Sequence, residues 1–91
     1  MSEPLRGTAE IRNAKGLHAR AAAKFCKTVE RFDADVLVAR NGTEVSGTSI
    51  MGLMMLAAGI GCPLQLRVQG RQAREALAAL KALVEGKFDE D

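Results

Sequence analysis

The chain has 91 residues, a formal net charge of +2, and three aromatic side chains, all of them phenylalanine. Its length predicts a single domain over residues 1–91, and its composition, 47% hydrophobic and 26% charged, is typical of a globular protein. The low charge and few aromatic rings argue against nucleic-acid binding, and the sequence shows neither a signal peptide nor an apolar run of the ~20 residues that span a membrane.

The first predicted elements are a strand over residues 5–12, a loop over residues 13–16 and a helix that ends near Arg31. The alternation of polar and apolar side chains indicates the strand, and an alanine-rich run indicates the helix. Apolar side chains at helical spacing predict the buried stripe of this helix, at Ala22, Cys26 and Val29, with Phe25 on its flank. His18 is therefore expected where the loop becomes the helix.

His18, the only histidine, is the candidate reactive residue. The first turn of a helix presents unpaired N–H groups and the positive end of the helix dipole, and both attract anions. Arg20 can bind a phosphate through two parallel hydrogen bonds. A neutral imidazole at such a site is a nucleophile suited to accepting and handing over a phosphoryl group. The alternative is that His18 is only a helix cap or a polar surface residue.

Basic side chains recur at helical spacing on the other face of this helix, at Arg20, Lys24, Lys27 and Arg31. Two interpretations stay open for this basic stripe. It is either an ordinary solvated face or a surface that docks an acidic partner beside His18.

Residues 36–39 predict a second strand, Asn41-Gly42 a hairpin turn and residues 43–46 a third strand. Ser49 predicts the N-cap of a short helix over residues 50–56. That helix has almost no polar face, and Leu53 and Leu56 are sufficient for its core side. The remaining apolar side chains, Ile50, Met51 and Met54, are therefore expected to form a partly exposed patch.

Residues 64–69 predict a fourth strand and residues 71–85 the longest helix, with Gly86 at its C-terminal cap. Phe88 and the acidic residues 89–91 are expected to fray. The element order predicts an α+β fold, a two-layer open-faced sandwich. In it a four-stranded, mainly antiparallel sheet has three helices on one face (βαββαβα).

Cys26 and Cys62 lie in apolar stretches without CxxC spacing. Since there is no second histidine, the sequence lacks the ligands of a zinc site, and no metal or cofactor is expected. Two isolated thiols suit a reducing cytoplasm, and each is predicted to be a small buried side chain.

Two motifs in this element order resemble those of the HPr family, the phosphocarriers of the bacterial phosphoenolpyruvate-dependent phosphotransferase system. Residues 16–20, Gly-Leu-His-Ala-Arg, are similar to the phosphorylation-site motif, and residues 49–54, Ser-Ile-Met-Gly-Leu-Met, are similar to the regulatory-serine motif. Two departures are visible. Ala21 stands where the family usually has proline, and Met55 where some members have a small polar residue.

The resemblance implies that His18 accepts a phosphoryl group on Nδ1 from Enzyme I and passes it to an EIIA-type protein, while Arg20 steadies the phosphate. It also implies that an HPr kinase/phosphorylase modifies Ser49. Such a protein is a stoichiometric carrier and not an enzyme, and it is expected to be a cytoplasmic monomer. Its expected docking surface has an apolar centre and a basic rim. These residues are Ile50, Met51 and Met54, surrounded by Ala19, Arg20, Lys24 and Lys27.

A second hypothesis is a regulatory protein-binding module in a nitrogen- or carbon-sensing phosphotransferase branch, with no direct part in sugar transport. It would use the same surface, switched at Ser49. The presence of His18 favours phosphoryl transfer over a purely regulatory role.

Overall fold

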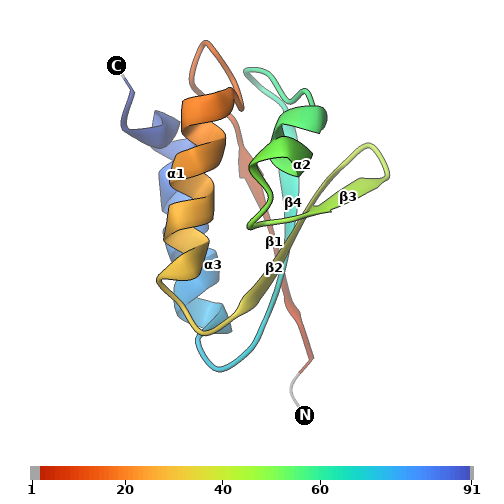
Figure 1. The fold of residues 1–91 in the computed structure, drawn as a ribbon, viewed down its shortest axis with the longest axis vertical. Helices are drawn as coiled ribbons and strands as arrows, with labels where there is room; N and C mark the ends of the chain where they lie inside the picture. Colours follow the sequence, from red (N-terminus) through yellow and green to blue (C-terminus); the bar gives the residue numbers. More distant parts are fainter. Residues whose placement is uncertain (1–2, 91) are drawn as a thin grey trace.

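The structure is a computed structural model that describes residues 3–90. Within them lie four strands, three α-helices and one short 3-10 helix (Figure 1). In chain order they are β1 (Leu5–Glu10), α1 (Ala19–Glu30), β2 (Asp35–Arg40), β3 (Thr43–Ser46), α2 (Ile50–Met55), β4 (Pro63–Gln69), α3 (Ala73–Glu85) and the 3-10 helix η1 (Lys87–Asp89). The predicted order is confirmed, and η1 is an addition to it.

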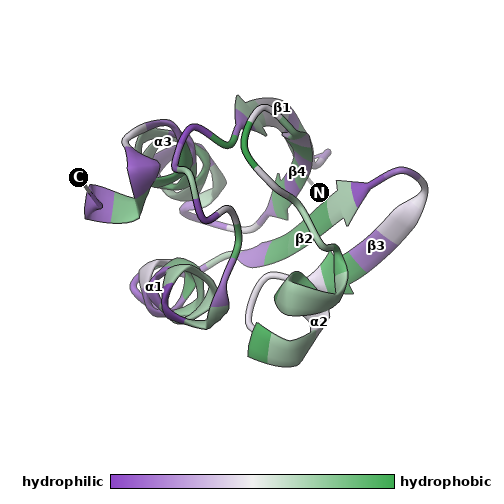
Figure 2. Cartoon of the chain, turned by 90° about the horizontal axis from the view of Figure 1, so that it is seen from above, coloured by the Kyte–Doolittle hydropathy of each residue, from purple (hydrophilic) through white to green (hydrophobic). Residues whose placement is uncertain are grey.

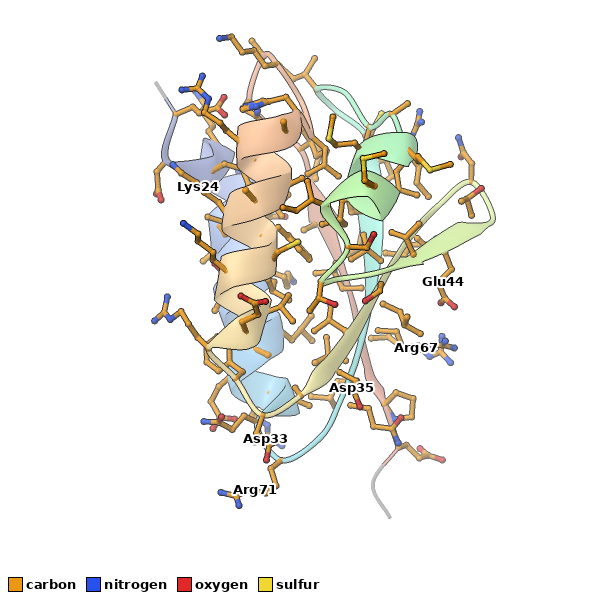
Figure 3. The ribbon with its side chains drawn as sticks, in the orientation of Figure 1. Lys24, Asp33, Asp35, Glu44, Arg67 and Arg71 are labelled. Carbon is orange, nitrogen blue, oxygen red and sulfur yellow. The ribbon has the colours of Figure 1, made fainter. Side chains whose placement is uncertain are left out.

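The strands form one sheet in the order β1-β4-β2-β3, and every neighbouring pair is antiparallel. Side chains that face the helices, such as Ala9, Val38 and Leu66, are buried. The opposite face is polar, and there Arg67 donates to Glu44 over 3.1 Å between Nη2 and Oε1 (Figure 3). Figure 2 shows the helices gathered on one side of the sheet. The predicted open-faced sandwich is thereby confirmed.

Asn41 and Gly42 form the hairpin turn between β2 and β3 with φ angles of 50° and 82°. Positive φ at both central residues is what a two-residue turn needs to match the twist of its strands. The residues that flank the turn, Arg40 and Thr43, pair directly. The register of the edge strand β3 is therefore set by this turn.

Phe25 and Phe88 are among the largest side chains that are fully buried in the core. Phe25, predicted on the flank of the buried stripe of α1, is fully buried there with Ala21. The prediction for Phe88 was wrong, because Phe88 is buried and not frayed. After Gly86 the chain takes left-handed φ angles of 63°, 52° and 63° at residues 87–89, and this turn brings Phe88 under α1 and α3. Asp91 lies outside the described residues.

Cys26 is buried and Cys62 is partly buried, and both are free thiols. Burial raises the pKa of the Cys26 thiol, and the nearby charge of Glu30 adds to the effect. Among the described residues, each helix is too short or too polar to cross a bilayer.

Candidate functional site

His18 is the N-cap residue of α1, with an extended backbone at φ −80° and ψ 179°. Its Nδ1 accepts the backbone N–H of Arg20 at 3.2 Å, and its carbonyl oxygen accepts the N–H of Ala22 at 2.8 Å. A nitrogen that accepts an amide N–H must hold its lone pair. The ring is therefore fixed with the Nδ1 lone pair over the first turn of α1.

The loop that carries His18 is fixed on the loop that follows α2. Leu17 donates its N–H to the carbonyl oxygen of Ala58 at 2.9 Å. Gly16 has φ +67°, and a Cβ there would lie 2.5 Å from the same oxygen. The close approach of the two loops therefore requires glycine at residue 16. This contact places His18 beside α2.

Glu90 contacts the imidazole from the C-terminal end of the described chain. His18 Nε2 is hydrogen-bonded to Glu90 Oε2. The other carboxylate oxygen accepts from Asn13 Nδ2 at 3.1 Å, and the same Nδ2 donates to the carbonyl of Gly16 at 2.8 Å. The His18 hydrogen bond holds the pKa of the Glu90 carboxyl below its usual 4.5, and Asn13 and the positive charge of Lys15 add to this.

Asn13 is 2% exposed and is the buried polar side chain of the core. Sequence reasoning missed both Asn13 and Glu90. Nothing local in the sequence marks a contact between residues 72 positions apart. The available signal was Phe88, a large apolar residue just past the last helix, whose burial returns the tail to the core.

A hollow of about 430 Å³ is bordered by Glu90, the hydrogen-bond partner of His18, and three basic side chains, Lys15, Arg20 and Lys24, line it. Ala14 and Asp89 complete its lining. Lys24 also donates from Nζ to the carbonyl of Phe88 at 2.8 Å, and Figure 3 shows it on the side of α1 that faces the C-terminal segment. The predicted basic stripe thus reaches this hollow at Arg20 and Lys24.

The more distant members of the stripe, Lys27 and Arg31, are exposed. The Arg31 guanidinium lies over the ring of Phe32, 5.7 Å from its centroid. These two side chains lie further from His18 along α1. Ala19, at the start of the helix, is exposed as well.

Ser49 is the N-cap of α2, as predicted, since its Oγ accepts the N–H of Gly52 at 2.9 Å. The apolar side chains beyond this cap are exposed, by 42% at Ile50, 72% at Met51 and 41% at Met54, whereas Leu53 is fully buried. The expected exposed patch is confirmed, and Met55 and Ile60 extend it. Figure 2 shows α2 as a largely hydrophobic helix beside the more polar α1.

The model of the family described as PTS HPr component phosphorylation site matches residues 5–86. Phosphocarrier protein HPr of Pseudomonas aeruginosa is 52% identical over 81 residues, which cover 88% of this chain and 90% of that protein. Phosphocarrier protein NPr of Shewanella violacea is 42% identical over 80 residues, 88% of each chain. The crystal structure of HPr from Thermoanaerobacter tengcongensis superimposes with a TM-score of 0.89 at 39% identity, covering 96% of this chain and 98% of that one.

Proposed function

The chain belongs to the HPr family of phosphocarrier proteins, and on that premise we propose that His18 is the residue that accepts and hands on the phosphoryl group. As a phosphocarrier it takes part in phosphotransfer without being a self-contained enzyme. The observation that supports His18 is the direction of its ring. Nδ1 has its lone pair free of a proton and lies over the unpaired amides of α1.

In the proposed reaction, the donor is a phosphohistidine of Enzyme I. The Nδ1 lone pair of His18 forms a bond to phosphorus while the donor's N–P bond breaks, and that electron pair returns to the donor ring. The second transfer, to an EIIA-type protein, repeats these steps with His18 as the donor. The first-turn amides and the Arg20 guanidinium would bind the phosphoryl oxygens.

The proposed docking surface combines the exposed apolar side chains of α2 with the exposed start of α1. Ile50, Met51 and Met54 form its centre, and Ala19, Arg20, Lys24 and Lys27 its rim. The two parts lie side by side, because the loop before α1 is bonded to the loop after α2. An apolar centre with a charged rim is typical of protein–protein interfaces. A partner with acidic groups around an apolar site would fit it.

Ser49 is proposed as a regulatory site for an HPr kinase/phosphorylase, since its hydroxyl lies at the edge of this surface. The second candidate function is a carrier in a regulatory nitrogen branch. The similarity to NPr favours it. The two candidates differ in the EIIA-type protein that receives the phosphoryl group, and not in the chemistry at His18.

The test incubates the protein with phosphoenolpyruvate and Enzyme I. The parent is expected to take up phosphate that is lost in acid, as phosphohistidine is, and His18→Ala is expected to take up none. This variant should still fold, with a somewhat lower melting temperature, because it loses the side-chain cap of α1 and the contact with Glu90. Acid-labile phosphate on His18→Ala would contradict the proposal. Offering the phosphorylated parent a sugar-branch and a nitrogen-branch EIIA protein in parallel then distinguishes the two candidates by the faster acceptor.

A further inference from the structure

We propose that Glu90 is a positioning residue for phosphoryl transfer, which fixes the proton of the His18 ring on Nε2 and faces the positive charge that the ring acquires. This inference rests on the proposed role of His18 as acceptor. It assigns a function to the C-terminal segment, which has no part in the transfer step as described above.

The hydrogen bonds around the ring determine its tautomer. Nδ1 accepts from the Arg20 amide, so the proton of a neutral ring lies on Nε2. Nε2–H then donates to Glu90 Oε2. A carboxylate can only accept, so it favours this tautomer over the one with a proton on Nδ1. The tautomer that it favours is the one with the nucleophilic lone pair available.

The Glu90 carboxylate is itself held in place. Its Oε1 accepts from Asn13 Nδ2, and Asn13 is buried and also bonded to Gly16, within the loop that precedes His18. Two residues before Glu90, Phe88 is fully buried and its carbonyl accepts from Lys24. Asn13 therefore holds the carboxylate of Glu90, and Phe88 with Lys24 holds the backbone before it. Together these contacts direct the carboxylate at the His18 ring.

The charge of Glu90 matters during transfer. When the Nδ1 lone pair bonds to phosphorus, the proton stays on Nε2 and the ring becomes a cation. A carboxylate at Nε2 stabilises that cation. The His18 and Glu90 side chains are 22% and 25% exposed, so solvent weakens the interaction. An effect of about two- to fivefold on the transfer rate is expected, the range measured for partly exposed ion pairs.

The test compares Glu90→Ala and Glu90→Gln with Glu85→Gln. The control removes one carboxylate at the end of α3, where Glu85 accepts the backbone N–H of Glu10 and does not touch His18. Two quantities are measured, the rate at which phosphorylated Enzyme I labels each protein and the His18 tautomer by ¹⁵N NMR of the unphosphorylated form. Both Glu90 variants are expected to transfer more slowly and to show more of the Nδ1-protonated tautomer, while Glu85→Gln matches the parent.

A Glu90→Ala variant with the parent's rate and tautomer would overturn the inference, and so would an equal loss of rate in Glu85→Gln. These outcomes are distinct from a failure of the proposed function. If the parent itself takes up no acid-labile phosphate, His18 is not the acceptor and the role of Glu90 in transfer falls with it. If the parent is labelled, only the comparison among variants decides the role of Glu90.

Discussion

At the scale of the residue, the two interpretations of His18 coincide. The sequence left open whether it is a helix cap or a nucleophile. The structure shows the cap, and in the proposed reaction the same Nδ1 lone pair would be the nucleophile. As a cap, Nδ1 accepts the Arg20 N–H. Once Nδ1 is bonded to phosphorus it can no longer accept, and the freed N–H would face a phosphoryl oxygen instead. In the proposed reaction, the cap would therefore hold this amide in place for the phosphoryl group.

Arg20→Ala tests the side chain separately from this amide. The substitution keeps the backbone N–H and removes a guanidinium that lines the hollow beside Glu90. We expect His18 to accept phosphate about tenfold to a thousandfold more slowly, the range for one lost charge-stabilising donor. The measurement is the labelling rate from phosphorylated Enzyme I, with Arg74→Ala, an exposed arginine of α3, as the control. An unchanged rate would show that the backbone amides are sufficient.

At the scale of the element, the N-terminus of α2 is capped by one hydroxyl group, that of Ser49. Ser49 caps a helix of six residues, and the exposed side chains of the apolar patch follow directly after it. Aspartate is also a good N-cap, whereas alanine is a poor one. Substitutions at residue 49 can therefore separate the stability of α2 from its surface charge.

Ser49→Ala is expected to lower the free energy of unfolding by about 1 kcal/mol, because the Gly52 N–H loses its acceptor. Ser49→Asp should keep the cap and place a negative charge beside Ile50 and Met51, where desolvation by an acidic partner is costly. It should fold like the parent and accept phosphate more slowly. Chemical denaturation and the His18 labelling rate are the two measurements. An aspartate variant as fast as the parent would make Ser49 a cap only.

The short element η1 is predicted to be anchored by Phe88. Phe88→Ala removes a fully buried ring and should lower the free energy of unfolding by about 3–5 kcal/mol, the usual cost of such a cavity. Met55→Ala is the matched control, since Met55 is 77% exposed and its loss should change stability by about 0.5 kcal/mol or less. Urea midpoints report both values. A midpoint equal to that of the parent would mean that the tail does not contribute to the core.

At the scale of the whole molecule, local patterns predicted the sheet, the helices and their caps. Alternation marked β1 and β4, Asn41-Gly42 marked the hairpin, and Ser49 marked the start of α2. What they missed is the C-terminal segment. Its course depends on three consecutive left-handed residues after Gly86, a conformation that is uncommon for Lys87 and especially so for the bulky Phe88. The contacts that hold it join residues far apart in the sequence, the C-terminal segment with Asn13, His18 and Lys24, and leave no local pattern.

The contact between Glu90 and His18 makes stability depend on pH in a definite direction. The pKa of Glu90 is lowered in the folded protein, first by its hydrogen bond with His18. A folded-state pKa below the unfolded value means that the unfolded chain binds the proton more readily. The contribution to stability is therefore present above the ordinary pKa of 4.5 and is lost as the pH falls through the lowered value.

Thermal unfolding of the parent, Glu90→Gln and Glu85→Gln from about pH 7 down to about pH 3 would measure this dependence. The parent should melt at a higher temperature than Glu90→Gln near neutral pH, and the two should converge as Glu90 becomes protonated. The Glu85→Gln variant corrects for the loss of one negative charge from the same end of the chain. Because Glu90 is hydrogen-bonded to both His18 and Asn13, convergence would show that the ionised carboxylate adds to the stability of the fold through these contacts. Identical curves for the parent and Glu90→Gln at every pH would show that the segment is held by Phe88 and Lys24 alone.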